Sequence, residues 1–180
     1  AVGSASLDAN TTGANNTAVG FASLGANSTG TDNVAVGYGA LDANLASSNV
    51  AIGSGAMLVN TTGATNTAVG YLALDANTTA SNNVAIGSSA LTATTTGHSN
   101  VAVGQSALAA NTTGQENTAL GAQALVTNTT ASDNVAVGRQ TMYANTTGAE
   151  NVAVGANALD ANTTGGSSVA VGKGALGAAT

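Results

Sequence analysis

The residues of this chain that could carry chemistry recur at regular intervals. The most frequent pattern is Asn-x-Thr, the acceptor sequence for N-linked glycans. It occupies one position of a repeat at Asn10, Asn27, Asn60, Asn77, Asn111, Asn128, Asn145 and Asn162. Glycans on these asparagines would line one edge of an elongated molecule. Alternatively, Asn and Thr occur here because both residues form turns well, and the sequence leaves the two interpretations open.

Carboxylates form a second candidate set, in two further positions of the repeat. These residues are Asp8, Asp42, Asp75 and Asp160 in one position and Asp32, Glu116, Asp133 and Glu150 in the other. Calcium binding needs several oxygens that converge on one point. The aspartate-bearing, glycine-rich repeat of calcium-binding β-rolls is missing, so a solvated acidic face is favoured. The only histidine, His98, has no Ser or Cys nucleophile motif nearby. We therefore expect no catalytic residue, no metal site, no cofactor and no enzymatic activity.

These residues recur because the whole chain is built from a 17-residue unit. We number its positions 1 to 17 from the asparagine that precedes Val-Ala-Val-Gly. The glycine at position 5 recurs at Gly3, Gly20, Gly37, Gly53, Gly70, Gly87, Gly104, Gly121, Gly138, Gly155 and Gly172. Such a period predicts an all-β parallel β-solenoid of about 10 coils, a rod on the order of 50 Å long. One spacing, between Gly37 and Gly53, is 16 residues. We expect the missing residue to lie in a turn, because a deletion there does not change which way the side chains of the strands point.

Positions 2 to 4 alternate β-branched residues with alanine, which predicts a short strand. We expect position 4 to form the buried core ladder and the alanine of position 3 to point outward. The position-4 residues are Val2, Val19, Val36, Ile52, Val69, Ile86, Val103, Leu120, Val137, Val154 and Val171. A second short strand is expected at positions 8 and 9, which read Ala-Leu in most copies. The exposed alanine columns would then favour packing of one chain along another.

Position 1 is almost always asparagine. The column consists of Asn16, Asn33, Asn49, Asn66, Asn83, Asn100, Asn117, Asn134 and Asn151, with Ser168 as the exception. Stacked asparagines form hydrogen-bonded ladders in cross-β structures. The alternative is that each asparagine only caps a local turn.

The bulk composition narrows the classes of protein. The net charge is −6 and Arg139 and Lys173 are the only basic residues, so binding to a nucleic-acid backbone is not expected. Cysteine is absent, and no apolar run is long enough to insert in a membrane. We expect residues 1–180 to form a single repeat domain that begins and ends inside a repeat and belongs to a longer fibre.

Several segments resemble the head repeats of trimeric autotransporter adhesins, the YadA-like heads, and repeats of phage-type tail fibres. The resemblance rests on 49–56 (NVAIGSGA), 66–74 (NTAVGYLAL) and 168–172 (SVAVG), and it extends over essentially the whole chain. It implies a left-handed β-roll, a homotrimer of parallel chains, an extracellular, cell-surface or virion location, and adhesion to a host-surface or glycan receptor. The unit is longer here than in the adhesin heads, and the extra residues form the Asn-Thr-Thr-Gly turn.

We therefore expect a structural fibre or adhesin segment that associates with itself, as a homotrimer or as an end-to-end filament. The alternative is an ice- or carbohydrate-binding solenoid that uses the Asn-Thr-Thr edge. Thermal hysteresis distinguishes the two. Phe21, Tyr38 and Tyr71 share position 6, a variable position that is expected to face outward.

Overall fold

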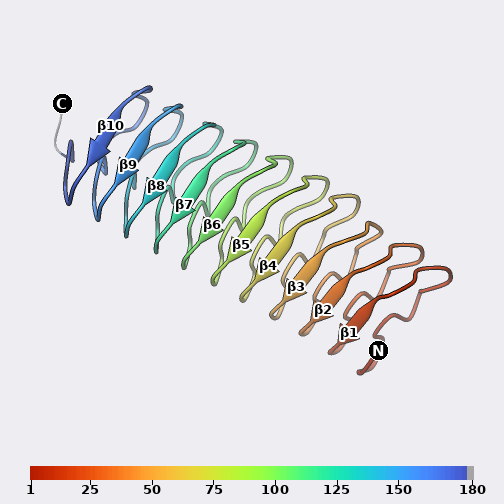
Figure 1. Ribbon diagram of the computed structural model, residues 1–180. Helices are drawn as coiled ribbons and strands as arrows, with labels where there is room; N and C mark the ends of the chain where they lie inside the picture. The colour runs from red at the N-terminus through yellow and green to blue at the C-terminus, as the bar shows by residue number, and fades with distance from the viewer. Residues whose placement is uncertain (178–180) are drawn as a thin grey trace.

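The computed structural model describes residues 1–177, which form an all-β parallel solenoid of about nine turns with no helix. Its ten strands occupy the same positions of successive repeats. They are β1 (Thr17–Val19), β2 (Val34–Val36), β3 (Val50–Ile52), β4 (Thr67–Val69), β5 (Val84–Ile86), β6 (Val101–Val103), β7 (Thr118–Leu120), β8 (Val135–Val137), β9 (Val152–Val154) and β10 (Val169–Val171). The two ends of the chain lie at opposite ends of the rod (Figure 1).

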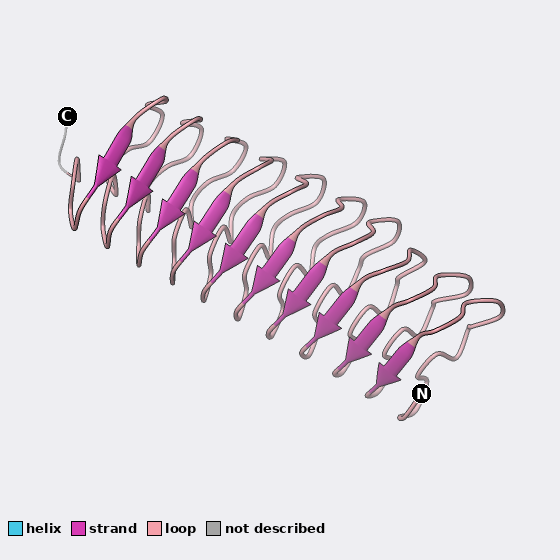
Figure 2. Ribbon diagram, in the orientation of Figure 1, coloured by secondary structure: helices cyan, strands magenta, loops and turns pink. Residues whose placement is uncertain are grey.

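Every strand pairs with its neighbour in sequence, in parallel and in register. The sheet order runs from β1 to β10 without a crossover. Ala85 of β5 lies beside Ala68 of β4 and Ala102 of β6, and the other pairs follow the same pattern. All the strands point the same way in one continuous row (Figure 2). Like residues therefore stack on like residues, one rung above another, where a rung is one turn of the solenoid.

The side of the strands that faces the interior is the opposite of the one expected. The alanines of position 3 are buried, and Ala35, Ala85 and Ala136 are fully so. The expectation that position 4 is buried is wrong: Ile86 is 39% exposed, and the whole position-4 column faces outward. The reason is width. The thin interior already holds the leucine or methionine of position 9, which leaves room for a methyl group from the strand but not for a β-branched side chain.

The expected second strand does not form anywhere within residues 1–177. Positions 6 to 11 of the repeat form a succession of turns instead. Two residues of this segment, at positions 7 and 9, adopt positive φ in rung after rung. Leu91 (φ 52°) and Met142 (φ 50°) are fully buried in that conformation. A left-handed residue reverses the direction in which the neighbouring peptide groups point. Alternate N–H groups therefore bond to the rung above and the rung below: Leu91 N–H donates to the Ala107 carbonyl, and Ser89 N–H to the Tyr71 carbonyl.

The glycine of position 5 is required by both conformation and space. Gly104 has a φ of 137°, and a β-carbon there would lie 2.5 Å from the carbonyl carbon of Gly121 in the next rung. A side chain is excluded at this point of every interior rung because the backbones touch.

The one-residue deletion lies in the turn, as expected. Asn44 Nδ2 donates to the Ala46 carbonyl, two residues on, whereas Asn60 Nδ2 donates to the Gly63 carbonyl, three residues on. The missing residue therefore falls between Asn44 and Ala46. The strand register survives, since Val34 still pairs with Val50.

Candidate interaction surface

The outer face of the sheet is formed by positions 2 and 4, and we call it the strand face. Only valine, threonine, isoleucine and leucine occur in its two columns. Its β-branched residues favour the extended backbone of each strand and stand in two straight rows. In the inner rungs these side chains are half-buried or about two-fifths exposed, as at Val19 (40%) and Leu120 (38%). The strand face is therefore an uncharged, largely apolar surface that extends along the whole described rod.

The asparagines of position 1 form the ladder rather than isolated caps. Asn66 N–H donates to Asn49 Oδ1 over 2.9 Å, and Asn83 N–H donates to Asn66 Oδ1 over 2.9 Å. The same bonds link Asn33 to Asn16 at one end and Ser168 to Asn151 at the other. Because each side chain bridges two rungs, the column ties the described rungs together through buried, satisfied amides.

The asparagines of position 12, which carry the sequons, form a second ladder inside the solenoid. Asn128 Nδ2 donates to Asn111 Oδ1 over 3.0 Å, and Asn145 Nδ2 donates to Asn128 Oδ1 over 3.1 Å. Asn27, Asn60, Asn77, Asn111, Asn128 and Asn145 are fully buried. A glycan on any of these six residues would disrupt the ladder, because the amide nitrogen that would carry it is a hydrogen-bond donor in the interior. Asn162 is half-buried and donates in the same way, and Asn10 in the first turn is exposed.

The position-12 ladder is incomplete at two points. Asn27 Oδ1 and Asn77 Oδ1 are buried without a hydrogen-bond partner. Above Asn27 lies the shortened turn of Asn44, and above Asn77 lies Thr94 in place of asparagine. Both orphaned oxygens thus lie directly below a rung whose sequence departs from the repeat.

The two threonines of the turn have different roles. At position 13 the hydroxyl group joins the inter-rung ladder: Thr112 Oγ1 donates to the Thr129 carbonyl over 3.0 Å. At position 14 the threonine is exposed in every rung that carries it. These residues are Thr12, Thr29, Thr62, Thr79, Thr96, Thr113, Thr130, Thr147 and Thr164. The outer surface of the turn is therefore a single column of threonines.

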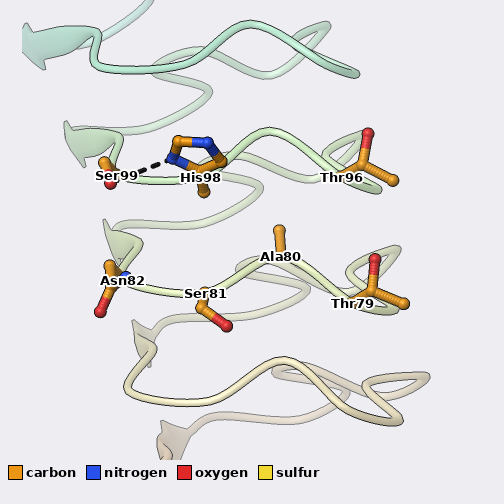
Figure 3. Close-up of a pocket in the computed structure, with 7 residues that line it drawn as sticks. All are labelled: Thr79, Ala80, Ser81, Asn82, Thr96, His98 and Ser99. Carbon is orange, nitrogen blue, oxygen red and sulfur yellow. Dashed lines mark hydrogen bonds between the residues drawn. The ribbon is translucent and has the colours of Figure 1, made fainter.

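His98 lies on an open groove between two rungs of this turn edge (Figure 3). Its Nδ1 is 3.2 Å from Ser99 Oγ. The neighbouring rung contributes Thr79, Ser81 and Asn82 to the lining of the groove. No carboxylate lines the groove, so the contact lacks the acid that orients a catalytic histidine.

The acidic residues stay apart in the described structure. Within residues 1–177, no three His, Cys, Asp or Glu side chains come together in a way that could hold a metal ion. A search of the same residues for a helix long and apolar enough to cross a membrane also finds none.

Comparison of the chain with protein-family models, with curated proteins and with solved structures finds no match.

Sequence reasoning missed the strand face, although a signal for it exists. Position 2 accepts threonine at Thr17, Thr67 and Thr118, which indicates an outward position. Positions 2 and 4 of a strand share a face, so position 4 faces outward with it. The alanine of position 3 never varies along the chain, as expected of the crowded side.

Proposed function

We propose that this chain is a segment of a rigid surface fibre in which three parallel copies pack through their strand faces. The observation that carries the proposal is the strand face itself, which contains no charged residue in either column of any rung. A continuous apolar surface of this length is unusual for a monomer in water and is typical of an interface.

The arrangement of the strand face favours copies that run parallel. Successive rungs present nearly the same residues at the same height, with Val34, Val50 and Val84 in one column and Val36, Ile52 and Ile86 in the other. Three parallel copies around a common axis would bring like rungs together and repeat one contact along the fibre. The number three and the left-handed winding come from the resemblance to the adhesin heads and tail fibres.

Stiffness supports the structural role. Each inner rung is held to its neighbours by the parallel sheet, by bonds from the turns and by the position-1 ladder, and most rungs also by the position-12 ladder. A rod of this kind acts by its length and its repeated surface, without a catalytic centre. We place it outside the cell or on a virion, with attachment to a host-surface or glycan receptor as its role.

The mass in solution, measured by light scattering, tests this proposal. The unmodified chain is expected to have three times its monomer mass of 16.8 kDa. The double variant Ile86→Asp, Val103→Asp places two carboxylates on the strand face and is expected to lower the mass toward that of one chain. The matched control is Thr96→Asp, Thr113→Asp, in the same two rungs at the exposed position 14, and it should leave the mass unchanged. A mass of 16.8 kDa for the unmodified chain would refute the assembly.

The exposed threonine column supports a second candidate, binding of ice or carbohydrate at the turn edge. Consecutive members, such as Thr79 and Thr96, lie one rung apart, about 4.8 Å. The asparagines of the same turn are buried, so the column alone would make the contact. Thermal hysteresis and ice shaping by the purified chain test this candidate. Substitution of Thr96 and Thr113 by aspartate should abolish both effects.

A further inference from the structure

One column of the solenoid carries an unusual share of the aromatic and basic residues. Position 6 holds three of the four aromatic residues, Phe21, Tyr38 and Tyr71, and both basic residues, Arg139 and Lys173. All five side chains are exposed. The column follows the glycine after each strand, along the edge at which the strands end (Figure 1). The aromatic residues lie in the first half of the rod and the cations in the second half.

The spacing of the two groups is the same. Tyr38 follows β2 and Tyr71 follows β4, so the tyrosines are two rungs apart. Arg139 follows β8 and Lys173 follows β10, so the cations are also two rungs apart. The rung between the members of each pair carries a small residue at position 6, serine in one case and alanine in the other.

We propose that the position-6 column binds a second copy of this chain that lies antiparallel, with a two-fold axis at Gln105. Gln105 follows β6, midway between the two groups. When the β6 rungs of two copies meet, the β4 rung of each faces the β8 rung of the other, and β2 faces β10. Tyr71 then meets Arg139 and Tyr38 meets Lys173, and symmetry forms each pair twice. On the axis, the Gln105 carboxamide meets its own copy, as donor and acceptor at once.

The chemistry of the paired rungs is complementary. A cation over the face of a tyrosine ring is attracted by the ring quadrupole, and arginine also stacks on the ring. Phe21 stacks on one side of Tyr38, with ring centroids 5.4 Å apart and planes at 13°. Position 6 of the next rung carries the small residue Ser54, and Tyr38 is 63% exposed, which leaves the ring accessible to a cation.

Position 10 lies four residues after position 6 in the same series of turns, and its charges also favour the pairing of tyrosine rungs with cation rungs. The two tyrosine rungs carry Asp42 and Asp75 at position 10, whereas the arginine rung carries Tyr143 there. A partner's cation would therefore approach a rung that bears an acidic group. The −6 charge of the chain would otherwise oppose side-by-side contact.

A parallel copy shifted by six rungs offers another way to join the two groups. That arrangement pairs Tyr38 with Arg139 and Tyr71 with Lys173, but each pair forms once. The antiparallel contact forms four pairs and leaves the strand face uncovered. It therefore joins one fibre to another side by side, and it does not depend on how many chains form each fibre.

Single-cysteine variants test the axis, because the chain contains no cysteine. Gln105→Cys places a thiol opposite its own copy, and mild oxidation should give a disulfide-linked dimer. Ser88→Cys, one rung away in the same column, is the matched control. In the antiparallel contact two such thiols lie two rungs apart, about 9.6 Å, and should not join. A mixture of Ser88→Cys and Ala122→Cys chains should join, because their rungs face each other.

The pairing residues provide the second arm. Arg139→Gln with Lys173→Gln in the Gln105→Cys chain should lower the dimer yield about tenfold or more. Without the disulfide, the substitutions should leave the mass of a single fibre unchanged, because the strand face is untouched, whereas the mass of fibres joined side by side should fall to that of one fibre. Equal linkage at residues 88 and 105 would indicate chains in parallel register and overturn the proposal. Linkage between Ser54→Cys and Ala156→Cys chains without linkage at residue 105 would show the shifted parallel contact instead. A disulfide-linked dimer yield that is the same with and without the Arg139 and Lys173 substitutions would also overturn the antiparallel contact.

Discussion

The break in the buried asparagine column at Thr94 predicts a single substitution that stabilises the fold. Where the column is intact, each side-chain amide donates to the asparagine oxygen of the preceding rung, as Asn145 does to Asn128. At the break, Asn77 Oδ1 is buried without a partner. Thr94 Oγ1 donates instead to the Asn111 carbonyl over 3.0 Å. Thr94→Asn replaces a fully buried side chain by one of similar volume that continues the column.

The magnitude follows from the bonds exchanged. The new amide would donate to Asn77 Oδ1 and accept from Asn111 Nδ2, while the bond from the threonine hydroxyl is lost. The net gain is one hydrogen bond, the one that satisfies the buried acceptor; such a bond contributes about 1 kcal/mol, and leaving the acceptor unpaired costs about 1–3 kcal/mol. We expect the free energy of unfolding to rise by about 1–2 kcal/mol. At this chain length, each kcal/mol raises the melting temperature by about 2–4 °C.

Urea unfolding followed by circular dichroism measures the effect, at matched protein concentrations so that assembly contributes equally. Thr96→Asn, an exposed change in the same turn, is the control and should be neutral within about 0.5 kcal/mol. A Thr94→Asn chain no more stable than the original would refute the reasoning. It would show that the orphaned oxygen costs little or that the column does not continue through this rung.

Three further predictions concern the interior. Leu108 is fully buried at a φ of 51°, so Leu108→Ala should cost about 2–5 kcal/mol in chemical unfolding. Leu108→Gly should cost no more than Leu108→Ala, because glycine has no penalty for left-handed backbone; a clearly less stable glycine variant contradicts that conformation. Gly104→Ala should cost more than about 3 kcal/mol or prevent folding, from strain and contact with Gly121, whereas Gly174→Ala, with nothing within 4 Å, should keep the fold. Peptide mass spectrometry after secretion from a glycosylating host should show Asn77, Asn111 and Asn128 unmodified in the folded protein; glycans on them would contradict the inner ladder.

The repeat in the sequence was enough to predict the strands, their parallel order and the turn that absorbs the deletion. These features depend only on which residues recur at which interval. The strands appear where positions 2 to 4 recur, and the short turn lies between Asn44 and Ala46 as the 16-residue spacing requires.

The alternation of large and small residues in the strands could not by itself predict which side of each strand faces the interior. Alternation divides a strand into two sides, and the larger side chains are usually the buried ones. Here the interior is narrow, and Leu91 and its equivalents enter it from the opposite wall in a left-handed conformation that leucine rarely adopts. Residue propensities argue against that conformation, so the sequence favoured a second strand where the structure has turns. Asn77 and its equivalents also lie inside, where bonds to the preceding rung and within the turn hold their side chains, and the Asn-x-Thr pattern alone does not indicate that burial.

The central claim is that like residues of successive rungs lie directly over one another. Spin labels on a column of exposed threonines test it most directly, in the triple variant Thr79→Cys, Thr96→Cys, Thr113→Cys, diluted with unlabelled chain. In-register rungs hold the three labels about 4.8 Å apart, so the spectrum should collapse toward a single exchange-narrowed line. The three separate lines of isolated nitroxides would contradict the stacked solenoid.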